Sequence, residues 1–290
     1  MKKTIQLGRE RGFCAGVRGA LSRFDETLRK SGAPLYVLDE LVHNRAVTEN
    51  MKARGAVFVD SLDQVPDNAT LLFGAHGVPP ETISTAESRH IHFVDATCPL
   101  VRQLQKAAAA VLPERDLILF GDPSHPEMKG VAASAGTRNI HFVSRLEDAE
   151  AIDKKLNCPL LLSQTTRNEK EIRAVAARLK EIFPQLEDHS GVCNAVMARQ
   201  QAVRELAEHC GIVLIAGSPH SSNALRLKEI ASSCGAKSYL IENIGDLPLE
   251  ELQSASCVGI SSGASTPEES VRQIIAALLP LGFLPPEETR

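Results

Sequence analysis

Three cysteine-containing stretches recur along this 290-residue chain at similar intervals. They are RGFCAG around Cys14, DATCPL around Cys98 and GVCNAV around Cys193, which are 84 and then 95 residues apart. Each cysteine directly precedes a segment in which apolar residues follow helical spacing. A thiol at the same loop-to-helix junction in three successive repeats predicts one shared ligand for the three thiols.

The helix predicted after Cys98 is the most clearly marked of the three. Pro99 would occupy its first position, where a missing backbone N–H costs no hydrogen bond. Its predicted apolar face consists of Leu100, Val101, Leu104, Ala108 and Val111.

A second pattern repeats with nearly the same period. Three segments each read as a strand followed by a polar turn with an acidic residue: 56–66, 140–150 and 238–248. Aligning Val59, Val143 and Ile241 gives spacings of 84 and 98 residues. Two unrelated features that share one period predict three related α/β units.

The repeats also set the predicted boundaries of the units. An N-terminal strand within residues 1–14 is expected to join the third unit, and a short flexible tail is expected to end the chain. The predicted ranges are 15–98, 99–192, 193–281 and, for the tail, 282–290.

Two loops in each predicted unit follow a Val/Ile/Leu-rich strand and carry polar residues. In open α/β sheets, ligands bind beyond the carboxyl ends of the strands. We therefore expect all six loops to face one central pocket. They occupy residues 36–44, 71–79, 117–127, 160–166, 212–223 and 257–267.

Composition limits the class of protein. An apolar fraction of 43% and a charged fraction of 23% are typical of a globular protein, and a net charge of −4 argues against a nucleic-acid or anionic-membrane partner. With no Trp and two Tyr, base-stacking surfaces are not expected. The N-terminus lacks the apolar core of a signal peptide and no apolar run reaches membrane-spanning length, so a cytoplasmic location is predicted. There, seven cysteines favour metal binding, catalysis or reduced thiols over disulfides.

Taken singly, a cysteine is most often a small buried hydrophobe, and this interpretation is kept for Cys158, Cys210, Cys234 and Cys257. The three recurring cysteines differ, because three thiolates suit either zinc or an iron–sulfur cluster. Structural zinc sites usually draw on close CxxC pairs, which this chain lacks. A 4Fe-4S cluster is therefore favoured, and with three cysteines its fourth iron would be left open as a Lewis acid.

The loops contain hydrogen-bond donors of the kind found around phosphate oxygens, although each could instead serve a turn or a helix cap. No nucleotide-binding glycine motif is present. The candidate phosphate-binding residues are His43, Asn44, His76, Ser221, Ser222, Asn223 and Ser265.

The HPE segment places His125 and Glu127 in one tight loop. In a shielded pocket, the pKa of Glu127 would rise and the carboxyl could deliver a proton. On an open surface, Glu127 would be an ordinary solvated carboxylate. Thr165, in the other loop of the same unit, could position a substrate hydroxyl.

Taken in order, these motifs resemble one family over about residues 5–280: the 4-hydroxy-3-methylbut-2-enyl diphosphate reductases, which catalyse the last step of the methylerythritol phosphate isoprenoid pathway. The motifs are RGFCAGV, VHN, AHGV, DATCPLV, HPE, SQTT, SSN and GAS.

The resemblance implies a pseudo-threefold trefoil of three α/β units around a 4Fe-4S cluster held by Cys14, Cys98 and Cys193. It implies reductive removal of an allylic hydroxyl, giving isopentenyl and dimethylallyl diphosphate, with ferredoxin or flavodoxin as the electron donor. Glu127 would be central to proton delivery, with His125 and Thr165 near the hydroxyl. The diphosphate would be held by His43, His76, Ser221, Ser222, Asn223 and Ser265.

The chain departs from the family pattern around its third cysteine. The family commonly has TICxxT there, whereas this chain has Val192 and Val196 at the two threonine positions. Two other interpretations remain open: a dehydratase similar to quinolinate synthase, and a non-catalytic relative that binds an iron–sulfur cluster or a diphosphate.

Overall fold

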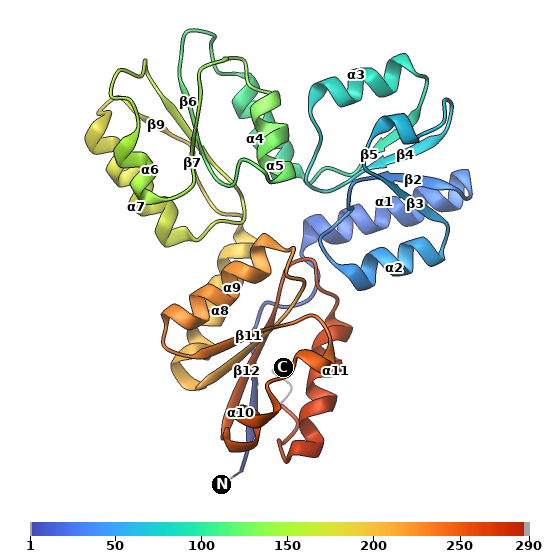
Figure 1. Ribbon diagram of the computed structural model, residues 1–290, viewed down its shortest axis with the longest axis vertical. Helices are drawn as coiled ribbons and strands as arrows, with labels where there is room; N and C mark the ends of the chain where they lie inside the picture. The colour runs from blue at the N-terminus through green and yellow to red at the C-terminus, as the bar shows by residue number, and fades with distance from the viewer. Residues whose placement is uncertain (1, 287–290) are drawn as a thin grey trace. The chain divides into compact units, whose positions relative to one another are not determined.

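A computed structural model of the chain describes residues 2–286. The protein is α/β, with three parallel four-stranded sheets (Figure 1). The chain divides into two compact units. Unit 1 contains one of the sheets and is made of residues 1–15, 43–47 and 194–290. Unit 2 contains the other two sheets and is made of residues 16–42 and 48–193.

The first sheet has the strand order β3-β2-β4-β5. Its strands are β2 (Leu35–Leu38), β3 (Ala56–Val59), β4 (Thr70–Phe73) and β5 (His92–Asp95). The helices of this part of the chain are α1 (Ala15–Ser31), α2 (Arg45–Ala53), the 3₁₀ turn η1 (Leu62–Gln64) and α3 (Pro80–Ser88).

The second sheet repeats this order as β7-β6-β8-β9. Its strands are β6 (Leu117–Phe120), β7 (Ile140–Val143), β8 (Leu160–Ser163) and the short β9 (Glu187–Asp188). Figure 1 shows its helices on both sides of the sheet, with α4 and α5 on one side and α6 and α7 on the other. They are α4 (Pro99–Ala109), α5 (Pro126–Ala133), α6 (Leu146–Ala151) and α7 (Glu169–Ile182).

The third sheet has the equivalent order β11-β10-β12-β1, so its last strand comes from the start of the chain. Its strands are β1 (Thr4–Leu7), β10 (Ile212–Ala216), β11 (Lys237–Ile241) and β12 (Cys257–Ser262). The helices are α8 (Asn194–His209), α9 (Ser222–Ser233), η2 (Ile244–Asp246), α10 (Leu249–Ser254), α11 (Glu268–Leu278) and η3 (Leu279–Leu281).

Backbone hydrogen bonds repeat at equivalent positions in all three sheets. The carbonyl oxygen of the last residue of β3, β7 and β11 accepts an N–H from the residue just after β2, β6 and β10. These last residues are Val59, Val143 and Ile241, the three that the sequence pattern aligned. The prediction of three related α/β units is therefore confirmed.

Each central strand is buried on both faces, as parallel sheets covered by helices require. In β10, Leu214 packs toward the cluster that includes α11, and its neighbours Val213 and Ile215 pack toward α8 and α9. Three of the six loops predicted to face the pocket follow strands that are entirely buried, namely β6, β8 and β10. The other three follow β2, β4 and β12, each of which has one half-buried residue. These cores fix the positions from which the motif loops start.

Some sequence expectations need correction. Leu100 is 41% exposed rather than part of the buried face of α4. It lies about 100° around the helix from Val101, which is buried, so both cannot point into the core. Cys158 and Cys234 are exposed rather than buried, because they lie in a loop with positive φ and at the C-cap of α9.

The end of the chain is packed further than the predicted boundary at residue 282. Phe283 is buried in the core of the third sheet, and the N–H of Leu284 donates to the carbonyl of Lys3. Residues 287–290 of the predicted tail lie outside the described residues. Within residues 2–286, no helix has both the length and the apolar character needed to cross a membrane.

The place of β1 in the third sheet generates a stability prediction. Ile5 is buried in the core of that sheet, whereas its neighbour Gln6 is exposed. Ile5→Ala should lower the free energy of unfolding by about 2–5 kcal/mol, the usual cost of a large-to-small core substitution. Gln6→Ala, the control in the same strand, should change it by less than about 0.5 kcal/mol. Urea unfolding of both variants measures the difference, and equal values would contradict the packing of β1.

Candidate functional site

Each of the three recurring cysteines has the same backbone environment. In each sheet, the cysteine N–H donates to a carbonyl oxygen in the loop after the strand that is second from one edge. The carbonyl belongs to the second residue after that strand. Cys98 donates to Ala75 after β4 (2.9 Å), Cys193 to Thr165 after β8 (3.1 Å) and Cys14 to Ala264 after β12 (3.0 Å). All three cysteines are half-buried and directly precede helices α4, α8 and α1. The structure thus gives the three thiols equivalent places in the three repeats.

Two of the cysteine loops begin with an aspartate that closes a tight turn. Asp95, the last residue of β5, accepts hydrogen bonds from the N–H and the hydroxyl of Thr97. Asp188, the last residue of β9, accepts the same pair from Ser190, at 3.0 and 2.5 Å. Such turns are a usual role of aspartate and fix the chain just before the cysteine.

The most chemically distinctive group is the buried carboxyl of Glu127 at the start of α5. Its side chain is 2% exposed and accepts two hydrogen bonds from Thr165: 2.7 Å from the backbone N–H and 2.9 Å from the hydroxyl. The imidazole Nδ1 of His125, the N-cap residue of α5, accepts the N–H of Glu127 at 3.2 Å. The predicted grouping of His125, Glu127 and Thr165 is present in unit 2.

Burial sets the protonation of this carboxyl. Loss of hydration raises the pKa of Glu127 from an ordinary 4.5 to about 7, although both hydrogen bonds from Thr165 act to lower it. A charged carboxylate is disfavoured in an apolar surrounding, whereas the neutral acid is not. Glu127 can therefore hold or release a proton near neutral pH, which the sequence predicted for a shielded position.

His76 extends this group. Its ring lies edge-on to that of His125, with centroids 5.5 Å apart and an angle of 85° between the planes. The loop carrying His76 also adjoins a cavity of about 560 Å³ that reaches the start of α5. Among the residues lining it are Gly77, Val78, Pro79, Pro126 and Lys129.

In unit 1, the candidate phosphate-binding residues Ser221 and Asn223 lie at the start of α9. The hydroxyl of Ser221 accepts the N–H of Ala224 and so caps the helix. Asn223 is 4% exposed, yet neither its amide oxygen nor its amide nitrogen has a hydrogen-bond partner among the described residues. A buried amide without partners is costly and points to a missing polar ligand. Ser222, between them, is half-buried.

Two glycines bring α9 close to the strand ends. A Cβ at Gly217, just after β10, would lie 2.7 Å from the Cβ of Ala224, and one at Gly263, just after β12, would lie 3.1 Å from it. The first contact is closer than side chains tolerate, so Gly217 is required for this packing. The N-terminus of α9, where unpaired N–H groups favour anions, is thereby held beside two motif loops.

The remaining candidates in unit 1 are also brought together. The hydroxyl of Ser265 donates to the carbonyl of His43 at 3.0 Å. The side-chain oxygen of Asn44 accepts the N–H of Val47 at 3.1 Å and caps the start of α2, the alternative role that the sequence left open. At the altered positions, Val196 is buried and Val192 packs against the core of the second sheet.

Several buried polar residues were not predicted. Gln164 accepts the N–H of Asp122 at 3.0 Å and is 1% exposed, so it holds the start of the HPE loop. Arg199 and Ser262 both bond to Gly12 in the first cysteine loop. Gln164 lies inside the SQTT motif, which was its only signal in the sequence. Ser262 lies inside the predicted loop 257–267, but nothing in the sequence singled it out. Arg199 had no signal, because its partner Gly12 is distant in the chain.

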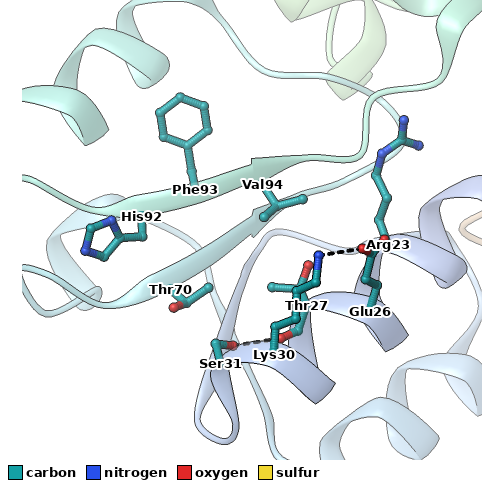
Figure 2. A pocket seen from close by; sticks show the side chains of 9 residues that line it. All are labelled: Arg23, Glu26, Thr27, Lys30, Ser31, Thr70, His92, Phe93 and Val94. Carbon is teal, nitrogen blue, oxygen red and sulfur yellow. Dashed lines mark hydrogen bonds and ion pairs between the residues drawn. The ribbon is translucent and has the colours of Figure 1, made fainter.

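A further cavity of about 370 Å³ lies beside α1 and the edge strand β5 (Figure 2). Figure 2 shows Lys30 of α1 paired with Glu26, across from His92 at the start of β5. None of the predicted site residues lines this cavity. It opens at the start of β5 and not at the carboxyl ends of the strands, where the motif loops are.

Comparison with known proteins gives consistent results. The family model described as "LytB protein" matches residues 5–279. A protein of Cutibacterium acnes is 38% identical over 99% of this chain and 90% of its own length. One of Rhodococcus opacus is 40% identical over 97% of this chain and 85% of its own length. Both are named 4-hydroxy-3-methylbut-2-enyl diphosphate reductase.

Two solved structures are also similar. The E-1-hydroxy-2-methyl-but-2-enyl-4-diphosphate reductase from Plasmodium falciparum superposes with a TM-score of 0.90 at 28% identity, covering 95% of this chain and 88% of that one. A second structure, described as (E)-4-hydroxy-3-methyl-but-2-enyl diphosphate reductase, the terminal enzyme of the non-mevalonate pathway, has a TM-score of 0.68 at 28% identity. It covers 97% of this chain and all of the other.

The raised pKa of Glu127 generates a pH prediction. The folded protein holds a proton on Glu127 up to about pH 7, whereas an unfolded chain releases it near 4.5. The resulting stabilisation is fully present below pH 4.5 and is lost as the pH rises through about 7. Glu127→Gln removes this dependence, so wild type should lose about 2–3 kcal/mol relative to the variant between roughly pH 5 and 8.

Urea unfolding of both proteins at several pH values measures this difference. Exposed Glu114 offers a matched control, and Glu114→Gln should track wild type at every pH. A difference between wild type and Glu127→Gln that stays constant with pH would show that Glu127 titrates as an ordinary carboxyl.

Proposed function

The chain belongs to the LytB protein family, and from this premise we propose that it is a 4-hydroxy-3-methylbut-2-enyl diphosphate reductase. Such an enzyme removes the allylic hydroxyl of its substrate as water, using two electrons and two protons. The products are isopentenyl and dimethylallyl diphosphate, at the end of the methylerythritol phosphate pathway. The observation that carries the proposal is the buried carboxyl of Glu127, held at both oxygens by Thr165.

The proposed cofactor is a 4Fe-4S cluster with Cys14, Cys98 and Cys193 as ligands. Support comes from the donor set: three half-buried cysteines, each directly before a helix, and cysteine sulfur is the ligand that holds iron–sulfur clusters in proteins. When bound, such a cluster supplies single electrons and an iron without a protein ligand that acts as a Lewis acid. The two valines near Cys193 leave this ligand set unchanged.

The proposed diphosphate site uses the start of α9. Asn223 supports it, because a buried amide with neither atom bonded needs a polar partner and a phosphate oxygen would supply one. The N-terminus of α9 adds backbone N–H groups suited to an anion. The other proposed diphosphate ligands are His43, His76, Ser221, Ser222 and Ser265.

Glu127 is the proposed proton donor. With a pKa of about 7, a substantial fraction of its carboxyl is protonated at neutral pH, so it can protonate a departing hydroxyl. Thr165 fixes the carboxyl and could orient the substrate hydroxyl. His125 accepts the N–H of Glu127 with its Nδ1 and so holds the start of α5. Its proposed place is near the substrate hydroxyl.

The reduction also requires an electron donor, and we propose ferredoxin or flavodoxin in the cytoplasm. No specific observation favours a dehydratase similar to quinolinate synthase, or a non-catalytic relative. The buried carboxyl with its raised pKa favours catalysis, because a protein that only binds a diphosphate has no use for a shielded acid.

Glu127→Gln tests the function directly. Turnover of the allylic diphosphate by the anaerobically reconstituted variant should fall by about 10²–10⁴-fold, because the amide cannot deliver the proton. Its iron and sulfide contents should equal those of wild type. Glu114→Gln should keep the wild-type rate. An unchanged rate in Glu127→Gln would remove this residue from the mechanism, and an inactive reconstituted wild type would contradict the reductase.

A further inference from the structure

The loop that leads to Cys14 is the longest of the three cysteine loops. Six residues separate the end of β1 from Cys14, against two between β5 and Cys98 and four between β9 and Cys193. The strand before it ends in Leu7, so it lacks the aspartate turn of the other two loops. It also contains Gly12 at φ +71°, a conformation that favours glycine. Besides the backbone bond from Cys14 to Ala264, this loop therefore needs further contacts to fix the residues before the cysteine.

Hydrogen bonds on both sides of the Gly12 residue hold this loop in place. Its N–H donates to the hydroxyl of Ser262 at 2.8 Å, and its carbonyl accepts a hydrogen bond from Nη2 of Arg199 at 2.7 Å. Both partners are buried. The loop is also joined at its surface by the ion pair of Arg11 with Glu268, at 2.8 Å. Arg199 is the only partner among these that comes from α8.

Arg199 connects this loop to the helix that follows another cysteine. Its side chain folds back along α8, and Nη1 donates to the carbonyl of Ala195 at 2.8 Å, in the first helical turn. The chain enters that turn directly from Cys193. One guanidinium therefore bonds to the peptide two residues before Cys14 and to the peptide two residues after Cys193. A lysine, with a single nitrogen, would not reproduce this two-armed geometry.

The position of this charge is unfavourable for the helix alone. The N-terminal end of a helix carries partial positive charge, so a cation beside its first turn is repelled. Arg199 is moreover 1% exposed, and burial of a guanidinium, which is always charged, costs desolvation energy. Local conflicts of this kind are typical of functional positions. A cation beside a metal centre held by thiolates would favour the more negative, reduced form of that centre.

We propose that Arg199 is a positioning residue for the iron–sulfur centre. Its guanidinium holds the loop of Cys14 to the first turn of α8, which directly follows Cys193, and its positive charge favours the reduced form of the centre. The inference rests on the proposed function, because it assumes that these cysteines bind the cluster. It adds a residue that carries no ligand atom and lies six positions after Cys193.

The test uses the reconstituted holoprotein and two variants. Arg199→Gln removes both the positive charge and the paired hydrogen bonds of the guanidinium. Iron should therefore be lost to a chelator about 10- to 100-fold faster, as for other groups that support metal ligands. Its midpoint potential, from an EPR-monitored redox titration, should shift to a more negative value. Arg199→Lys keeps the charge and should retain a potential near that of wild type while still losing iron faster.

Arg272→Gln is the matched control, because Arg272 lies in the same unit on α11 with a side chain that is 70% exposed. It should leave both quantities unchanged. If Arg199→Gln fails to fold, the rate at which Arg199→Lys loses iron to the chelator is the test. A rate equal to that of wild type would overturn the inference. Wild-type iron retention and potential in Arg199→Gln would also overturn it while leaving the reductase intact. A wild-type protein that binds no cluster would instead refute the proposed function itself.

Discussion

The backbone hydrogen bond from each recurring cysteine to the loop beside it is the contact on which the candidate site depends. Two residues past β4, β8 and β12, a carbonyl oxygen accepts the cysteine N–H. Each acceptor loop belongs to a strand that is hydrogen-bonded on both sides within its sheet. The position of each thiol is thus fixed by the buried core of its own sheet. The same three loops carry three of the proposed substrate-binding residues, His76, Thr165 and Ser265.

The acceptor loop after β8 couples the third cysteine, Cys193, to the candidate acid. Thr165 accepts the N–H of Cys193 with its carbonyl and donates to Glu127 with its own N–H and hydroxyl. One residue therefore positions a thiol and a carboxyl together. Displacement of Thr165 by substitution would disturb both, whereas a change at Glu127 leaves the backbone bond to Cys193 in place. A substitution at Glu127 should therefore affect proton delivery without displacing Cys193.

Local patterns in the sequence were enough to predict the repeats, the strands and the loops that carry the site. Pro99 marks the start of α4, and the three aligned residues Val59, Val143 and Ile241 each end a strand. Contacts between distant residues were not predictable. Arg199 looks like an ordinary helical arginine until its bond to Gly12, 187 positions away, is seen. The exposure of Leu100 depends on which side of α4 faces the core, and the spacing of apolar residues along the helix does not decide between Leu100 and Val101.

The central claim is that the three equivalent cysteines hold one cluster with an iron open to substrate. Mössbauer spectra of protein reconstituted anaerobically with isotopically enriched iron, with and without the allylic diphosphate, test it most directly. If the three cysteines hold such a cluster, the signal of a single iron should change when the diphosphate binds, while the remaining irons keep theirs. A preparation without cluster iron, or spectra that are the same with and without the diphosphate, would contradict it.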